Sequence, residues 1–283
     1  MSERYTELEA RIAGVEQFGT VVSALRGIAV TYAQQGRQRL AGVSRYADTV
    51  AEAIALALSL QAPAAAVPPA ARRGPPALLL FCAEQGFAGA FSEQVFDAAP
   101  DAAQSPLLVV GRRGLRVAAA RGLTAAWSVP MIAQPDGVAR LAERIALELV
   151  RRVGGGETVR AEMLYTQPAE RGGTRVERRS LLPLDLRRFG AVRRGPPPLI
   201  QLPPALLLRR LAEEYLRAEL ASAILHSFTA ENVARMTAMS AARDNIDSRL
   251  DALQREARRA RQDEITSELI ELAAGAEAQR TPA

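Results

Sequence analysis

The sequence contains no lysine, so all 36 of its basic residues are arginines. A phosphate-binding P-loop needs the lysine of its GxxxxGK[ST] motif, and a pyridoxal enzyme needs a lysine to form its Schiff base. Both classes of enzyme are therefore excluded, and we expect the chain to carry no cofactor.

Cysteine and histidine are almost as scarce, with Cys82 and His226 as the single examples. One cysteine cannot form an internal disulfide, which fits a reducing compartment. Neither residue has the partners that a zinc site requires. We expect Cys82 to lie in a core, because it follows the apolar run ALLLF, and His226 to lie on a helix without a ligand role. We predict neither a metal site nor a catalytic residue.

Long apolar runs are also missing. The opening MSERYTELEARI is charged, so it does not predict a secretory signal. The stretch 53–71 is uncharged, but Gln61, Pro63 and Pro68 interrupt it, and a membrane helix needs about 20 continuous apolar residues. We therefore expect a soluble protein that does not insert into a membrane.

What is abundant is helix-forming sequence at both ends. Residues 1–62 contain no proline, and apolar residues recur in them with a helical period. Every seventh position forms a row: Leu8, Val15, Val22, Ala29, Gly36, Val43 and Val50. A companion row lies three residues further on: Phe18, Leu25, Tyr32 and Tyr46. This pattern predicts one helix of roughly 85 Å, far longer than a small domain needs.

The C-terminal segment 205–276 also lacks proline, and a tail over 277–283 follows it. Its apolar positions again follow a seven-residue repeat: Met236, Met239, Ile246, Leu250, Leu253, Ala257 and Ala260. Two long helices at opposite termini can bury their apolar stripes on each other. We therefore predict that they form an antiparallel coiled coil.

Between the helices, proline-rich linkers over 63–76 and 193–204 enclose a domain of different character over 77–192. The runs ALLLFC and PLLVVG are typical of strands that are buried on both faces. The segments SEQVFDAA and GVARLAERIALELVRRV read as helices, and VRAEMLYT and RVERRSLLPL read as further strands. This alternation predicts an α/β fold with a Rossmann-like parallel sheet.

The segment 229–276, TAENVARMTAMSAARDNIDSRLDALQREARRARQDEITSELIELAAGA, resembles the C-terminal signature of the gamma subunits of F-type ATP synthases. The matching positions are Glu231, Ala234, Arg235, Met236, Ala238, Met239, Ala242, Asn245, Leu253, Arg261, Gln262, Ile265, Thr266, Glu268, Glu271, Gly275 and Ala276. So many matches along one helix make this a specific resemblance.

Other segments are similar to the same family in the same order. RIAGVEQFGTVVSALRGIAV (11–30) is similar to its first helix, and FCAEQGFAGAFS (81–92) is similar to its strand, loop and helix, with Gly86 and Gly89 kept. GRRG (111–114) stands where the family has GxKG. The resemblance covers nearly the whole chain.

Several positions depart from the family pattern. Thr20, Ser23 and Tyr32 stand in place of the lysines of the first helix, Gly27 replaces a methionine, and Ala88 replaces a cysteine. These changes indicate a divergent branch, for which an alternative ion-translocating ATPase is one candidate.

The resemblance implies a non-catalytic shaft inside a hexamer of alpha and beta subunits, with its foot beside the epsilon subunit and the c-ring. It would make the chain a peripheral protein on the cytoplasmic face of the inner (plasma) membrane. It assigns beta-subunit contacts to three residues: Arg261, Gln262 and Thr266. It assigns packing roles to seven others: Glu231, Arg235, Met236, Met239, Asn245, Gly86 and Gly89.

Two alternatives remain open at this point. A basic coiled-coil scaffold that binds nucleic acid would explain the many arginine pairs, but these pairs are spread along the chain and stacking aromatics are few. An enzyme built on the α/β domain would need a polar constellation, which we do not find. A phosphate loop within 82–91 is conceivable because glycines before a helix can bind anions, but we expect a packing turn there and no bound nucleotide.

Overall fold

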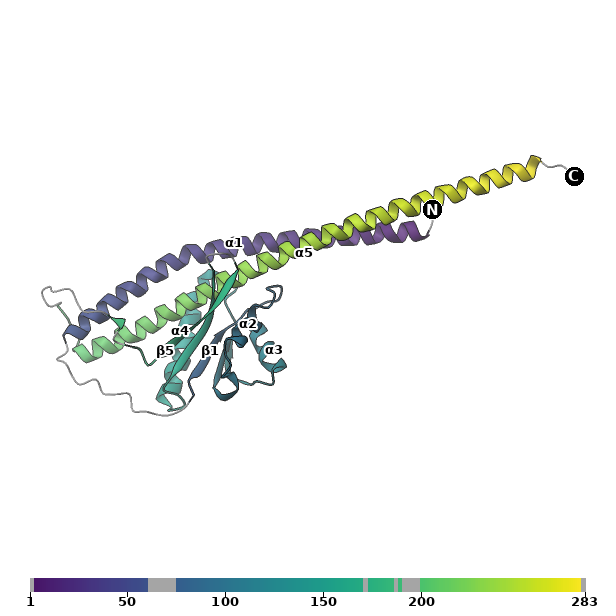
Figure 1. The fold of residues 1–283 in the computed structure, drawn as a ribbon. Helices are drawn as coiled ribbons and strands as arrows, with labels where there is room; N and C mark the ends of the chain where they lie inside the picture. The colour runs from purple at the N-terminus through teal and green to yellow at the C-terminus, as the bar shows by residue number, and fades with distance from the viewer. Residues whose placement is uncertain (1–2, 61–74, 170–172, 186–187, 190–198, 281–283) are drawn as a thin grey trace. The chain divides into compact units, whose positions relative to one another are not determined.

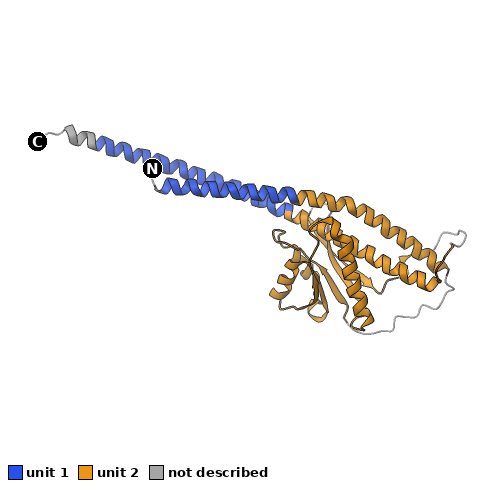
Figure 2. Ribbon diagram, turned by 180° about the vertical axis from the view of Figure 1, so that it is seen from behind, with its two compact units in different colours: residues 1–28, 236–283 blue, residues 29–235 orange. Residues whose placement is uncertain are grey.

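The computed structural model describes residues 3–60, 75–169, 173–185, 188–189 and 199–280. It divides into two compact units (Figure 2). Unit 1 comprises residues 1–28 and 236–283, and unit 2 comprises residues 29–235. Two helices run through both units: α1 (Glu3–Ser59) and α5 (Pro204–Arg280).

Unit 1 is a pair of helical segments. Leu8, near the start of α1, packs with Leu253 and Ala257 of α5, whereas Val22, further along α1, packs with Met239 and Ile246. Because the later α1 residue meets the earlier α5 residues, the two segments are antiparallel. The predicted antiparallel coiled coil is therefore confirmed.

The seam of α1 differs from the prediction in one row. The row that begins at Leu8 faces inward as expected, but Phe18 and Tyr46 of the predicted companion row are 58% and 46% exposed. The buried companions instead lie four residues after members of the first row, and they include Gly19, Ala33 and Ile54. The inward positions of α1 therefore alternate at spacings of four and three residues, as in a heptad seam.

Unit 2 contains a five-stranded sheet in the order β3-β2-β1-β4-β5. The strands are β1 (Ala77–Phe81), β2 (Leu107–Val110), β3 (Ala125–Val129), β4 (Ala161–Pro168) and β5 (Thr174–Leu182). The first four are parallel, which confirms the predicted sheet type, although no strand was predicted at β3. The strand β5 is antiparallel to β4, contrary to the prediction. The connection between β4 and β5 is too short for the crossover that a parallel pair requires, so these two strands form a hairpin.

Helices cover both faces of this sheet (Figure 1). On one face, Leu78 and Leu80 of β1 pack with α2 (Phe91–Asp97) and α3 (Arg112–Ala120). On the other face, the alternate residues of β1 pack with α4 (Val138–Gly154) and with residues 216–228 of α5. Every residue of β1 is buried, because one face of the strand meets each layer.

Most of the predicted linker over 63–76 and the first half of the predicted linker over 193–204 lie outside the described residues. Among the helices that the structure describes, none combines the length and the hydrophobicity needed to cross a membrane.

Candidate functional site

The end of β1 carries a polar anchor that joins three loops. The Glu84 carboxylate accepts hydrogen bonds from the backbone N–H of Met131, at 2.8 Å, and from that of Arg112, at 3.2 Å. The Arg112 Nε lies 3.0 Å from the same carboxylate. Arg112 is the first residue of α3, so the negative charge of Glu84 lies at a helix N-terminus, where it is stabilised. Glu84 therefore holds together the segments that follow β1, β2 and β3.

The GRRG motif contributes packing at the same edge of the sheet. Gly111 has a φ of 99°, and a Cβ added to it would lie 2.7 Å from the carbonyl oxygen of Ala83. A Cβ added to Gly114 would lie 2.7 Å from the Cys82 Sγ. Both glycines let α3 begin directly against the end of β1. Cys82 is fully buried, and burial raises the pKa of its thiol far above the ordinary value.

Helix α5 crosses this edge and brings a buried carboxylate to it. Ala230 packs with Ala83, Ala88 and Phe91, and the neighbouring Glu231 is only 4% exposed. Burial raises the pKa of the Glu231 carboxyl, and the charge of the neighbouring Arg235 opposes that rise.

Arg235 completes the cluster. Its guanidinium forms an ion pair with Glu231, donates to the Asn232 Oδ1 at 2.9 Å and reaches the Gly86 carbonyl oxygen at 3.4 Å. Asn232 in turn donates to the carbonyl of Phe228, at 2.8 Å. The arrangement fastens one turn of α5 to the loop that follows β1.

The structure thus brings together some of the predicted signature residues and separates others. Gly86, Glu231 and Arg235 meet in one cluster, and Gly89 lies in the same loop with a φ of 59°. The remaining three lie in unit 1, where Met239 is buried, Met236 is partly buried and Asn245 is exposed.

The three residues to which the resemblance assigns partner contacts lie on α5 in unit 1 and are exposed. The Arg261 guanidinium stands 5.9 Å from the centre of the Tyr5 ring. The Thr266 hydroxyl donates to the Gln262 carbonyl at 2.8 Å, which is a bond within the helix. Because all three side chains are exposed, a partner protein could reach them.

Two features of these regions were not predicted. Around the exposed polar residues, α5 also exposes large apolar side chains: Ile265, Leu269, Ile270 and Leu272, with Leu272 71% exposed. Contiguous exposed apolar residues of this kind mark interaction surfaces. Glu84 was the other omission, although its position directly after a buried strand could have indicated that it faces the loops at the sheet edge.

The sequence model of the ATP synthase family matches residues 4–279 of the chain. Among curated proteins, the ATP synthase gamma chain of Frankia casuarinae is 26% identical over 98% of this chain and 98% of its own length. The ATP synthase gamma chain of Rubrobacter xylanophilus is 28% identical over 96% of this chain and 97% of its own length.

Solved structures share the fold at lower identity. A chain from the rotor of the Euglena gracilis mitochondrial ATP synthase, in rotational state 1, matches with a TM-score of 0.66 and 11% identity. The match covers 93% of this chain and 99% of that chain. A chain from the central stalk and c-ring of the Tetrahymena thermophila mitochondrial ATP synthase matches with a TM-score of 0.55 and 18% identity, covering 78% of this chain and 99% of that one.

Proposed function

Because the chain belongs to the gamma-subunit family of F-type ATP synthases, we propose that it is the non-catalytic rotor shaft of such a complex. In this proposal, ion flow turns the c-ring and the shaft turns with it. The turning shaft then shifts the populations of open and closed conformers at the beta-subunit catalytic sites. ATP synthesis or hydrolysis itself belongs to the beta subunits.

The observation that carries this proposal is the paired helix of unit 1. Its antiparallel seam, from Leu8 with Leu253 to Val22 with Met239, joins the two chain ends into one rod. Beyond the start of α1, α5 exposes Leu269, Ile270 and Leu272. Exposing these side chains to water is unfavourable, so an apolar sleeve formed by the alpha and beta subunits would stabilise this end of α5.

We place the other partners at unit 2. The α/β domain would serve as the platform for the c-ring and the epsilon subunit, and the chain would be peripheral on the cytoplasmic face of the membrane. The divergent first helix favours a branch of the family such as an alternative ion-translocating ATPase.

The arginine pairs support this reading over a nucleic-acid scaffold. Three of these pairs form ion pairs with carboxylates of the chain: Arg112–Arg113, Arg151–Arg152 and Arg178–Arg179. Arginines that are neutralised in this way give little of the clustered positive potential on which duplex binding depends.

Co-expression with the alpha and beta subunits of the same organism tests the proposal. Purification through a tag on beta should yield hexamers with stoichiometric amounts of this chain. When this complex is joined to its membrane sector in vesicles, ATP hydrolysis should drive ion pumping. Hexamers that form and purify without the chain would refute the proposed function.

A further inference from the structure

A hollow of about 490 Å³ lies within unit 2, between the last turns of α4, the end of β5 and the N-terminal turns of α5. Its walls are mostly aliphatic and include Val150 and Val153 of α4, Leu182 of β5 and Leu216 of α5. Val150 and Val153 are exposed, so they belong to the surface of the hollow and not to the core of the sheet. Apolar hollows of about 300–1,000 Å³ are typical binding sites for small molecules.

Four charged side chains line this hollow, two of each sign: Arg188, Arg209, Glu213 and Glu219. Arginines outside the lining neutralise both carboxylates, because Glu213 pairs with Arg210 at 3.7 Å and Glu219 pairs with Arg179 at 2.9 Å. Among the described residues, no carboxylate forms an ion pair with Arg188 or Arg209. Both arginines are exposed, so the hollow carries two positive charges without a counter-ion where it opens to water.

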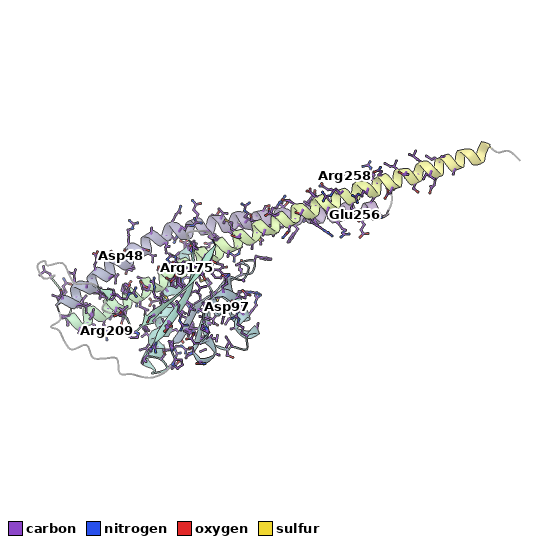
Figure 3. The ribbon with its side chains drawn as sticks, in the orientation of Figure 1. Asp48, Asp97, Arg175, Arg209, Glu256 and Arg258 are labelled. Carbon is purple, nitrogen blue, oxygen red and sulfur yellow. The ribbon has the colours of Figure 1, made fainter. Side chains whose placement is uncertain are left out.

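We propose that this hollow binds an amphiphile that consists of one alkyl chain and one anionic head group. The alkyl chain packs on Val153, Leu182 and Leu216, and its burial drives binding. The carboxylate or phosphate of the head group accepts hydrogen bonds from Arg188 and Arg209, the latter near the start of α5 (Figure 3). Hydrogen bonds between a guanidinium and an oxyanion are among the strongest in proteins.

A peptide segment of a partner protein suits this hollow less well than an alkyl chain. Each residue of a peptide would bring a backbone N–H and a carbonyl, and such groups need hydrogen-bond partners when they are buried. Among the described residues of the lining, only Ser180 and Tyr215 are uncharged and carry a polar side-chain atom. An alkyl chain brings no polar group into the hollow, so it leaves nothing unsatisfied there.

The alkyl part is tested by titration calorimetry of the full chain with sodium hexanoate, octanoate and decanoate, each below its critical micelle concentration. The dissociation constant should fall about threefold to fourfold for each added methylene, because each one buries a further CH₂ group. Octanol should bind at least about tenfold more weakly than octanoate, because it lacks the charge that the two arginines bind. Equal binding of octanol and octanoate would overturn the proposal.

The position of the head group is tested with Arg209→Gln, which should weaken octanoate binding at least about tenfold. Arg144→Gln is the matched control, because Arg144 is exposed on α4 in the same unit but does not line the hollow. It should bind octanoate as the parent chain does. Equal losses in the two variants would show that octanoate responds only to net charge, and the site would be wrong.

The position of the alkyl chain is tested with Ala212→Trp, which places a large ring in the hollow and should abolish octanoate binding. Ala241→Trp adds the same ring at an exposed position of α5 outside the hollow and should leave binding unchanged. Undiminished binding to a folded Ala212→Trp would overturn the proposal. If Ala212→Trp does not fold, the comparison of Arg209→Gln with Arg144→Gln decides.

Flotation with vesicles of phosphatidylcholine and phosphatidylglycerol distinguishes the two sources of such an amphiphile. Flotation that Arg209→Gln weakens more than Arg144→Gln assigns the site to a membrane lipid, a source that rests on the proposed function. Octanoate binding without such flotation assigns it to a free amphiphile. If no alkyl carboxylate binds and Arg209→Gln prevents assembly, the hollow belongs to a partner protein and the proposal is overturned. Failure of the parent chain to assemble with alpha and beta would refute the proposed function alone, and the octanoate result would stand.

Discussion

Gly36 of α1 lies directly against Thr229 of α5 within unit 2. A Cβ added to Gly36 would overlap the Thr229 hydroxyl and lie 3.4 Å from the Phe228 ring. The Tyr32 ring, one helical turn before Gly36, packs on the same Phe228 with 5.8 Å between ring centres. The two helices therefore approach each other closely at a position where only glycine fits without a shift.

We predict that Gly36→Ala lowers the free energy of unfolding by about 1–3 kcal/mol, because overpacking a close helix contact forces its neighbours to move. Gly42→Ala is the control, because nothing lies within 4 Å of a Cβ added to Gly42 on the same helix. It should raise stability by up to about 1 kcal/mol through helix propensity. Urea unfolding followed by circular dichroism measures both, and equal effects of the two substitutions would contradict the prediction.

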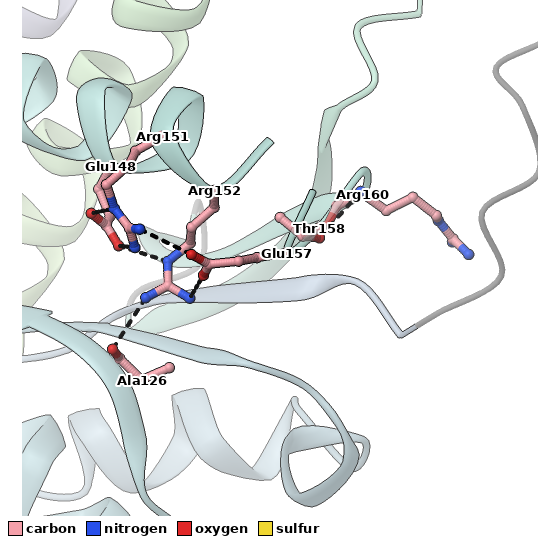
Figure 4. A network of polar contacts seen from close by, with 7 residues as sticks. All are labelled: Ala126, Glu148, Arg151, Arg152, Glu157, Thr158 and Arg160. Carbon is pink, nitrogen blue, oxygen red and sulfur yellow. Dashed lines mark hydrogen bonds and ion pairs between the residues drawn. The ribbon is translucent and has the colours of Figure 1, made fainter. Parts of the chain in front are cut away.

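A buried arginine closes the C-terminal end of α4 (Figure 4). The Arg152 guanidinium donates to Glu148 at 2.7 Å, to Glu157 at 3.0 Å and to the Ala126 carbonyl of β3 at 3.1 Å. Arg151 binds the same two carboxylates, but its side chain is 56% exposed, against 9% for Arg152.

Arg152→Met should therefore lower the free energy of unfolding by about 3 kcal/mol. The substitution removes the buried donor on which two carboxylates and one backbone carbonyl depend. Arg151→Met should cost less than about 1 kcal/mol, as is usual for exposed ion pairs. Denaturant titration of the two variants checks this difference. A larger loss for Arg151→Met would show that burial does not set the strength of this network.

The sequence predicted the parts of the fold that a repeating pattern encodes. Proline-free periodic segments predicted the two long helices, and short apolar runs predicted β1 and β2. The direction of β5 was not encoded in this way, because alternation along a strand is the same in parallel and antiparallel pairs. Phe18 was assigned to the seam because a repeat of three and a repeat of four residues both fit a helix, and only packing against the partner decides between them.

The site was predicted less completely. The resemblance singled out Gly86, Glu231 and Arg235, but it did not predict that they meet. Gly86 is far in sequence from the other two residues, and only the fold brings them together. Glu84 was not singled out, because its position after a buried strand indicates only that it lies at the sheet edge. Its role depends on which backbone N–H groups face it, and these belong to three separate loops.

The pH dependence of stability should contain a contribution from His226. This ring lies 5.8 Å from the Tyr165 ring, and burial together with the Arg179 charge lowers its pKa below the ordinary value of 6.5. Between these two pKa values the unfolded chain binds more protons than the folded chain, so stability rises with pH. The stability that the neutral His226 ring contributes is fully present above about pH 6.5 and is lost as the pH falls below that value.

His226→Phe keeps a ring beside Tyr165 and removes the titrating group. The difference in unfolding free energy between the parent chain and His226→Phe should therefore change with pH below 6.5, with the parent losing more stability on acidification. Unfolding titrations at several pH values measure it. Parallel curves for the two proteins would show that His226 does not titrate differently in the folded and unfolded states.

Arg261 offers the sharpest separation of partner binding from folding. It is exposed on α5 and stacks only loosely on Tyr5, so Arg261→Ala should change the unfolding free energy by less than about 1 kcal/mol. In the assembled complex, the same substitution should lower ATP-driven ion pumping several-fold, because a two-point contact between arginine and a carboxylate is worth about 1.5–3 kcal/mol.

Arg258, also exposed on α5 (Figure 3), is the matched control. Arg258→Ala removes the same charge from the same helix and should leave pumping near the parent level. If both substitutions lowered pumping equally, the effect would come from net charge along the rod. If neither lowered it, the contact with beta assigned to Arg261 would be wrong. Only a loss confined to Arg261→Ala, in a chain of unchanged stability, identifies a specific contact that the rotor makes with its partners.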